Sequence, residues 1–166
     1  MHRMLSKATV AATAAAVAAG ALSGVAGAAG PSHSGTINYL AVSSNNGKPV
    51  DIVTGAITDH GTDRSASKTT QEIVLSKGSF QVDATKFNKS FKFKFDPQGC
   101  SAVGTALATN LPISHGTGTY AAITGSISVK ATILETGVIK NGKCQNLNRK
   151  ASAEVTSFSG TGHVSY

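Results

Sequence analysis

The sequence predicts an all-β protein, an antiparallel barrel of about eight strands that is preceded by a signal peptide. Three observations indicate this fold. Beyond the N-terminal segment, apolar residues recur at every second position, which is the period of a half-buried strand. Turn residues, mainly glycine and asparagine, separate these segments, and no later run has apolar residues at helical spacing. A closed barrel also removes the exposed strand edges that a secreted protein must otherwise protect.

Residues 1–28 have the order of features found in a secretory signal peptide. Arg3 and Lys7 make the start positive, residues 8–19 carry no charge, and Ala26-Gly27-Ala28 resembles a cleavage site. A membrane-spanning helix is the alternative, but it needs roughly 20 strongly apolar residues, and this segment is alanine-rich and interrupted by glycine and serine. We therefore expect cleavage after Ala28, a secreted or extracellular protein, and no stable membrane anchor.

The remaining chain has the size of one domain and a moderate positive charge. Since Arg3 and Lys7 leave with the signal and all 8 acidic residues stay, the net charge falls from +7 to +5 with histidines neutral. Such an excess favours solubility and weak attraction to polyanions. Cys100 and Cys144 are expected to form a disulfide in an oxidising compartment, because metal or redox cysteines usually occur as a close C-x-x-C pair.

The first part of this domain is predicted to contain one strand between loops. Residues 30–35 are rich in glycine and serine and indicate a flexible arm, while the polar residues 43–49 and 59–63 indicate loops. Between the two loops, residues 50–58 are rich in β-branched side chains and predict a strand. We assign residues 29–49 to a flexible arm that could hold a first strand, and residues 50–166 to the barrel domain.

Alternating phenylalanines and lysines follow a predicted turn at Lys77-Gly78. Residues 80–85 alternate apolar with polar side chains and predict a strand. Within residues 86–95, aromatic and basic side chains occupy alternate positions. The odd positions include Phe87, Phe91, Phe93 and Phe95, and the even positions include Lys86, Lys92 and Lys94. This predicts one strand with an aromatic face and a basic face.

Two more strands are predicted towards the C-terminus. Residues 123–133 alternate isoleucine, valine and alanine with serine, threonine and lysine. Asn141-Gly142 favours a type I′ hairpin turn, because both residue types tolerate positive φ. The return strand is expected at residues 150–158.

Three motifs stand out in residues 50–166: the glycine-rich segment 116–126 (GTGTYAAITGS), the FDPQGC segment 95–100 and the KNGKC segment 140–144. Together they resemble the calycin-like barrel superfamily of allene oxide cyclase and dirigent-like proteins, and especially its small secreted actinobacterial members. The resemblance implies an antiparallel barrel. It also implies a lipophilic substrate or ligand, since the plant cyclases bind a fatty-acid epoxide and dirigent proteins bind phenoxy radicals. None of the plant catalytic residues can be placed on this sequence.

The candidate functional residues form three sets. An apolar ligand cavity would be lined by Phe80, Phe91, Phe93 and Phe95, although the same side chains could equally fill a narrow core. Contacts to an anionic surface would come from Lys86, Lys92 and Lys94, with a solvated barrel exterior as the alternative. A structural turn is expected at Gly116, Gly118 and Gly125.

No catalytic constellation is apparent in the sequence. There is no G-x-S-x-G nucleophile motif and no phosphate-binding loop, and His60 and His115 lie in predicted loops without metal-ligand spacing. We expect no cofactor, no metal and no specific nucleic-acid partner. The leading hypothesis is a non-enzymatic extracellular or cell-surface binding protein, for example for an anionic cell-wall polymer. An isomerase, cyclase-like or carrier barrel for a lipophilic small molecule is the second, and a structural cell-envelope protein is the third.

Overall fold

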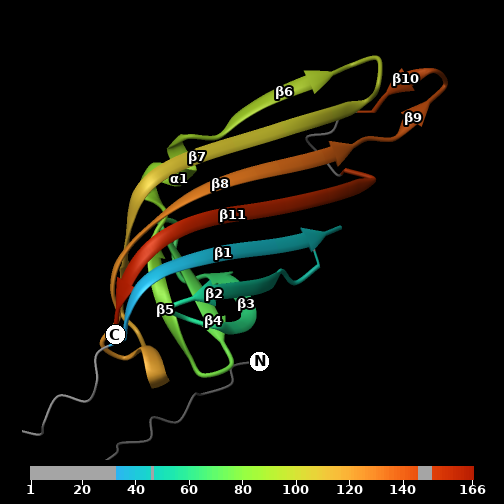
Figure 1. Cartoon of the computed structure of the whole chain (residues 1–166). Coiled ribbons are helices and arrows are strands. Elements are labelled where there is room, and N and C mark those ends of the chain that lie inside the picture. The colour runs from blue at the N-terminus through green and yellow to red at the C-terminus, as the bar shows by residue number, and fades with distance from the viewer. Residues whose placement is uncertain (1–32, 46, 146–150) are drawn as a thin grey trace, which may run out of the picture. The chain divides into compact units, whose positions relative to one another are not determined.

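Strands make up most of the chain that this computed structural model describes, which covers residues 33–45, 47–145 and 151–166 (Figure 1). The described residues all fall within the compact unit Pro31–Tyr166. Outside them lie the predicted signal peptide, the start of the predicted arm and residues 146–150. In chain order, the elements are β1 (Ser34–Ser44), β2 (Val50–Gly55), β3 (Asp59–Ser65), β4 (Thr70–Leu75), β5 (Gly78–Asp83), α1 (Thr85–Lys89), β6 (Lys92–Asp96), β7 (Ser101–Ser114), η1 (Gly118–Tyr120), β8 (Thr124–Thr136), β9 (Ile139–Lys140), β10 (Lys143–Cys144) and β11 (Ala153–Ser165).

Eight antiparallel strands close into a barrel. The sheet order is β5-β4-β3-β2-β1-β11-β8-β7-β6, and a further pairing of β5 with β7 joins the two sides. This closing pairing is short and matches Gln81 with Ser114 and Val82 with Ile113. The predicted antiparallel barrel of about eight strands is therefore confirmed, and β6 is an additional strand that pairs only with β7.

The long strands extend beyond the closed part of the barrel. β1, β7, β8 and β11 have 11 to 14 residues, whereas β2 to β5 have 6 or 7. In Figure 1 the long strands run side by side into a curved, open sheet, with β6 along its edge. β5 pairs with the C-terminal end of β7, and β6 pairs with its N-terminal part, so β5 and β6 contact different parts of the same strand.

Alternating side chains from these strands fill the barrel core. Inward positions are almost completely buried, as at Ile37, Ala41 and Val53, and the neighbouring outward positions are exposed. The predicted strands at 50–58, 80–85 and 123–133 correspond to β2, β5 and β8, with Phe80 and Val82 pointing into the core. Period-two patterning thus located these strands because each has one buried and one solvated face.

One prediction about the beginning of the domain is wrong, and the possible first strand within residues 29–49 is present as β1. Residues 59–63 form part of strand β3 instead of a loop, because their polar side chains have hydrogen-bonding partners inside and outside the barrel. The barrel also begins at β1, earlier than residue 50, since β1 pairs along its length with β11 and with β2. The return strand similarly reaches beyond residue 158, to Ser165.

The predicted single strand over residues 86–95 is also wrong, because the segment divides into helix α1 and strand β6. Asp83 Oδ1 accepts a hydrogen bond from the Thr85 backbone N–H at 2.8 Å, which turns the chain at the end of β5. Phe87 and Phe91 have a spacing that suits a helical turn as well as a strand, and their rings meet edge to face with centroids 5.2 Å apart. The alternation of side chains along the chain therefore could not distinguish a helical turn from a strand in this segment.

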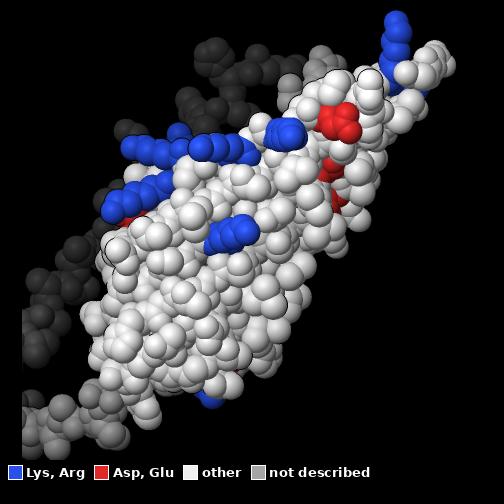
Figure 2. Space-filling model, turned by 45° about the horizontal axis from the view of Figure 1, so that its top comes forward, with Lys and Arg blue, Asp and Glu red and all other residues white. Residues whose placement is uncertain are grey.

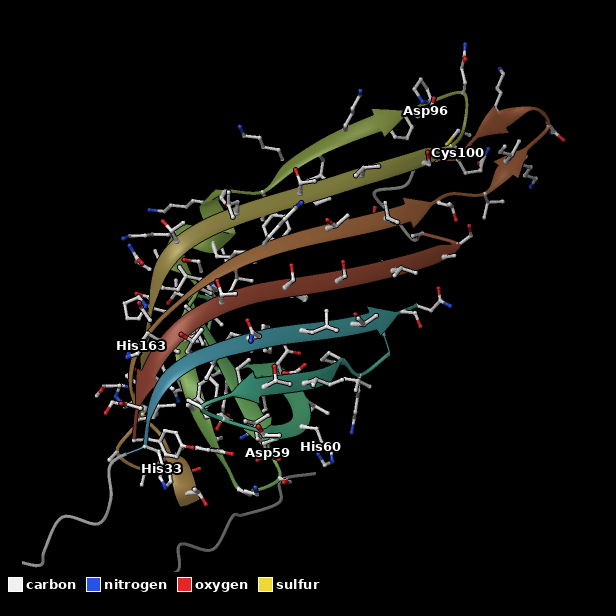
Figure 3. All side chains as sticks on the ribbon, viewed as in Figure 1. His33, Asp59, His60, Asp96, Cys100 and His163 are labelled. Atoms are coloured by element: carbon white, nitrogen blue, oxygen red, sulfur yellow. A yellow bond between two sulfur atoms is a disulfide. The ribbon has the colours of Figure 1, made fainter. Side chains whose placement is uncertain are left out.

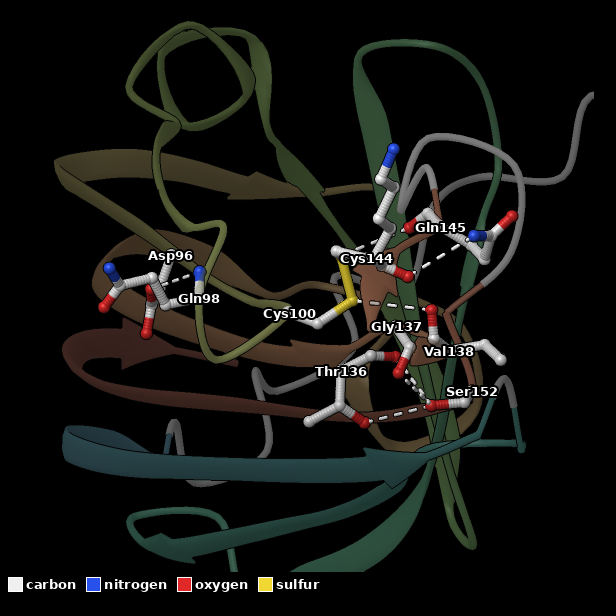
Figure 4. The surroundings of a disulfide bond; sticks show 10 residues. Asp96, Gln98, Cys100, Thr136, Gly137, Val138, Cys144, Gln145 and Ser152 are labelled. Atoms are coloured by element: carbon white, nitrogen blue, oxygen red, sulfur yellow. Dashed lines mark hydrogen bonds between the residues drawn. A yellow bond between two sulfur atoms is a disulfide. The ribbon is translucent and has the colours of Figure 1, made fainter. Parts of the chain in front are cut away.

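The predicted disulfide joins Cys100 to Cys144 (Figure 4). It connects the turn before β7 to the small β9–β10 hairpin, which is a separate two-stranded sheet. The hairpin turns at Asn141-Gly142, where φ is 53° and 70°, as the predicted type I′ turn requires. The bond therefore attaches a small peripheral hairpin to the open end of the long strands.

Candidate functional site

The barrel contains a cavity of about 320 Å³. Mostly apolar side chains from the barrel strands and α1 surround it. The aromatic members are Tyr39, Phe80, Phe87, Phe91 and Phe158. Ser65 and Asn88 also line the cavity and are solvent-exposed, so it reaches the surface at the end of the barrel where α1 lies.

Helix α1 covers part of this opening. Phe87 points into the barrel and is only 7% exposed, while the neighbouring Lys86 and Lys89 face solvent. The side-chain amide of Asn88 donates a hydrogen bond to the backbone oxygen of Lys68 at 3.0 Å. This bond ties α1 to the turn between β3 and β4, so both segments form the rim of the opening.

One side of the cavity is polar. The Gln71 side-chain amide donates a hydrogen bond to Asp63 Oδ2 at 2.8 Å, and the Ser65 hydroxyl donates to Gln71 Oε1 at 3.4 Å. Burial raises the pKa of Asp63 above its ordinary value, although the hydrogen bond from Gln71 lowers it in part. These three residues come from β3 and β4, and with Tyr39 they form what we call the polar wall.

Behind the polar wall, Tyr39 contacts a second buried carboxyl group. The Tyr39 hydroxyl donates a hydrogen bond to Asp51 Oδ2 at 3.2 Å, and Asp51 has no solvent exposure. Within the described chain, Asp51 Oδ1 is buried without a hydrogen-bonding partner. Burial raises the pKa of Asp51 to about 7, the charge of Asp63 adds to the rise, and the hydrogen bond from Tyr39 opposes it.

The Tyr39–Asp51 pair can therefore hold or release a proton near neutral pH. Burial, with the adjacent Asp51, also raises the pKa of the Tyr39 hydroxyl, so this group stays protonated and acts as a donor. Because Tyr39 lines the cavity and Asp51 lies behind it, the charge of Asp51 acts on cavity contents through Tyr39. The polar wall thus combines neutral donors with the carboxyl group of Asp63, and the carboxyl group of Asp51 lies behind it.

The opposite end of the barrel is closed by η1 and its loop. Tyr120 is 2% exposed and donates a hydrogen bond from its hydroxyl to Asp59 Oδ2 at 2.7 Å. Ser76 and the backbone N–H groups of His60 and Lys77 also donate to this carboxylate. Burial opposes ionisation of Asp59, yet these hydrogen bonds together hold its pKa well below the ordinary range.

Close backbone contact at the same end explains two of the predicted turn glycines. A Cβ atom on Gly116 would lie 1.6 Å from the backbone oxygen of Tyr120, and one on Gly118 would lie 2.4 Å from that of Lys77. Gly118 also has a φ of +58°. Gly125, the third predicted residue, has a φ of +137° in β8 and lies against β11. The loop therefore packs tightly against the β4–β5 turn and supports the closed end.

The four predicted cavity phenylalanines divide into two pairs. Phe80 and Phe91 line the cavity, whereas Phe93 and Phe95 in β6 are 60% and 52% exposed and do not. Phe93 nevertheless stacks on Phe91 with ring centroids 6.0 Å apart. An aromatic row thus leads from the cavity wall out to the inner face of the open sheet.

Sequence reasoning missed the polar wall and Asp51. Asp63 lies in a segment expected to be a loop, and Asp51 lies in a predicted strand whose apolar neighbours Val50 and Ile52 point outward. One feature of the sequence could have identified Asp51: it is an acidic residue within a run of β-branched residues. A carboxyl group buried in a strand needs a specific partner.

The predicted surface lysines are exposed on α1 and β6. Lys86, Lys92 and Lys94 lie near one another along the chain with Lys89 between them, and we call these four the basic face. Figure 2 shows Lys and Arg side chains gathered along one side of the molecule, while most of the remaining visible surface is uncharged.

Neither of the two histidines considered from sequence lies in the cavity wall. His60 is 80% exposed and points away from the barrel beside the buried Asp59 (Figure 3). His115 contacts the neighbouring Ser114 hydroxyl through Nδ1 at 2.8 Å. Across the described residues, no group of three or more His, Cys, Asp or Glu side chains is arranged to hold a metal ion.

Comparisons with protein-family models, curated proteins and solved structures find no match to this chain. The resemblance to the allene oxide cyclase and dirigent-like superfamily therefore stays a prediction. Among the described residues, helices are too short and polar to meet the criteria for crossing a membrane.

Proposed function

We propose that this protein is a secreted binding protein that holds a small amphipathic molecule in its barrel. The observation that carries the proposal is the cavity itself, which has an aromatic wall on one side and the polar wall on the other. Apolar pockets with a few convergent polar groups are typical of small-molecule sites. The aromatic wall would supply affinity, and the polar wall would orient the ligand.

The two ends of the cavity differ in a way that suits reversible binding of a ligand. Its closed end is held by Tyr120 and Asp59, and its opening is bordered by α1 and the β3–β4 turn. Short surface elements of this kind open more easily than the strands of a barrel. A ligand would therefore enter past α1 without separating barrel strands.

The direct test is binding of a neutral fluorescent probe, N-phenyl-1-naphthylamine, which brightens in apolar cavities. The chain has no tryptophan, so protein emission interferes little. Val129→Phe would fill the cavity and should abolish the brightening. Val103→Phe places the same substitution on the exposed outer face of β7 and should leave it unchanged. Equal binding by both variants, or no binding by the native protein, would contradict the proposal.

Secretion is tested on the protein recovered from the culture medium. Mass spectrometry should find an amino terminus at Ala29 and a mass that rises by about two hydrogens on reduction of the Cys100–Cys144 disulfide. Recovery of the protein only inside cells, with Met1 retained, would contradict this part of the proposal.

A second binding function is favoured by the basic face. Its four lysines are all exposed and come from two adjacent elements, and α1 also borders the cavity opening. Such a face attracts an anionic polymer, and an anionic cell-wall polymer is the partner we propose. Its position would hold the cavity opening close to the cell surface.

This function is tested by sedimentation with purified cell wall at rising salt. The double substitution Lys92→Gln with Lys94→Gln should weaken association, and added salt should weaken it further. Lys140→Gln with Lys143→Gln removes the same charge from the β9–β10 hairpin and serves as the matched control. Equal effects of the two double variants would show attraction by net charge alone and reject a specific basic face.

A further inference from the structure

Within the part of the chain that the structure describes, the cavity wall contains carboxylate charge without a cation. Among the described residues that line the cavity, Asp63 is the one charged side chain, and Asp51 lies behind Tyr39 close enough for the charge of Asp63 to raise its pKa. A buried charge is costly unless an opposite charge or several hydrogen bonds compensate it. The described chain supplies Asp63 with one side-chain hydrogen bond, from Gln71.

The cations nearest in sequence point away from the cavity. Arg64, which follows Asp63, pairs with Glu72 at 2.7 Å on the outer side of the β3–β4 hairpin. Lys68 in the hairpin turn is exposed, and so are Lys86 and Lys89 on α1. None of these cations belongs to the cavity wall, so the negative charge there faces no protein cation within the described chain.

Each donor residue of the polar wall already makes one hydrogen bond to another residue of the protein. Ser65 donates to Gln71, Gln71 donates to Asp63, and Tyr39 donates to Asp51. The chain of hydrogen bonds therefore ends on carboxylate oxygens, and an ionised carboxylate can accept several bonds at once. What the wall still lacks is a donor with positive charge.

We propose that the ligand of this cavity is an organic amine, with its apolar body against the phenylalanines and its protonated nitrogen at Asp63. This inference rests on the proposed small-molecule binding function and specifies the chemical class of the ligand. An ammonium group supplies the missing charge and up to three N–H donors. An anionic amphiphile such as a fatty acid would instead meet like charge in a site of low dielectric.

The aromatic wall supports the same ligand class. Phe80, Phe87, Phe91 and Phe158 surround the cavity, and ring faces attract organic cations in addition to burying hydrocarbon. A cavity of about 320 Å³ lies at the small end of the range for small-molecule pockets, about 300–1,000 Å³. A phenylalkylamine has this size and both chemical features.

Binding of an amine should strengthen as the pH rises towards about 8. Burial raises the pKa of Asp63 and raises that of Asp51 to about 7, so acid favours the neutral form of each group. Above about pH 7 Asp51 is ionised, while an alkylamine is still protonated because its pKa lies near that of lysine, about 10.4. Amine binding should therefore release protons near neutral pH.

The experiment compares three compounds that share one body: 4-phenylbutylamine, 4-phenylbutan-1-ol and 4-phenylbutanoate. Each competes with bound N-phenyl-1-naphthylamine at about pH 8, where Asp51 is ionised. We expect the amine to bind about tenfold more tightly than the alcohol, and the carboxylate to bind most weakly. At about pH 5, where Asp51 is protonated, the advantage of the amine over the alcohol should be smaller.

Asp63→Asn should remove the advantage of the amine over the alcohol. Glu72→Gln removes a carboxylate from the outer side of the same hairpin and should preserve the advantage. If Asp63→Asn fails to fold, the pH series on the native protein decides. Equal binding of the three compounds, or tighter binding of the carboxylate, would overturn the amine proposal while leaving small-molecule binding intact. Failure of the neutral probe itself to bind would instead overturn both.

Discussion

The Tyr39 hydroxyl donates a hydrogen bond to Asp51 Oδ2 at 3.2 Å, and within the described chain Asp51 Oδ1 remains buried without a partner. This pairing places a carboxyl group with one unpartnered oxygen beside the cavity of the barrel. Its ionisation is costly, because burial and the neighbouring Asp63 both raise the pKa of Asp51. The barrel therefore tolerates a destabilising group next to its cavity, which is common where a site serves ligand binding instead of stability.

Asp51 should make the native protein less stable at higher pH. Because its pKa is about 7 in the folded state and about 3.9 when unfolded, the folded state binds more protons between these values. The free energy of unfolding should consequently fall as the pH rises from about 4 to about 7, and then level off. Asp51→Asn should flatten this fall in urea unfolding curves measured across the pH series.

Tyr39→Phe provides the matched comparison for that prediction. It keeps the buried Asp51 carboxyl group but removes the hydrogen bond that lowers its pKa. The loss of stability should then extend to higher pH than in the native protein. A pH profile that neither variant alters would contradict the assignment of this dependence to Asp51.

Tyr120 should stabilise the barrel through the ionised form of Asp59. Tyr120→Phe removes a hydrogen bond to a carboxylate, so we expect a loss of about 1.5–3 kcal/mol near neutral pH. Since the bond lowers the pKa of Asp59, its contribution is present above the ordinary carboxyl pKa and should shrink as the pH falls below about 4. Urea unfolding at neutral and acid pH measures both effects.

Tyr166→Phe is the control for Tyr120→Phe. The Tyr166 ring packs against Tyr120 with centroids 5.4 Å apart, but its hydroxyl donates to the backbone oxygen of Ala56. Its removal should cost about 1 kcal/mol at every pH, because no carboxylate is involved. A loss with the same pH dependence in both variants would reject the role given to Asp59.

The disulfide should contribute stability without shaping the cavity. Replacing both Cys100 and Cys144 with serine should lower the free energy of unfolding by up to about 4 kcal/mol, the loop-entropy value for this separation. The bond lies between the start of β7 and the β9–β10 hairpin, away from the cavity-lining residues. Circular dichroism and probe binding should therefore remain native-like, and loss of the cavity would contradict this view.

Phe91 and Phe95 should differ in their effect on ligand binding. Phe91→Ala removes a ring from the cavity wall and should weaken binding of N-phenyl-1-naphthylamine about tenfold. Phe95→Ala removes an exposed ring from β6 and should have little effect. Fluorescence titration distinguishes them, and equal losses would show that the open sheet, instead of the closed barrel, binds the probe.

Local patterning was sufficient for the barrel class and for several individual strands. The alternation of apolar and polar residues was enough to predict β5 and β8. The φ preferences of Asn141 and Gly142 were enough to predict the hairpin turn. The segment around Phe87 and Phe91 was assigned incorrectly, because their spacing satisfies both a strand parity and a helical turn. Only packing of Phe87 beneath the rim of the barrel decides between them.

The sequence by itself determined that strands with one apolar face would close around a core and that two distant cysteines would pair. It did not determine which side chains meet inside. Val50 and Ile52 are as apolar as Val53, so local chemistry cannot show that β2 turns Asp51 inward. Antiparallel pairing of β1 to β4 brings Tyr39, Asp51, Asp63 and Gln71 together. Tertiary structure alone decided the site because barrel closure selects one face of every strand at once.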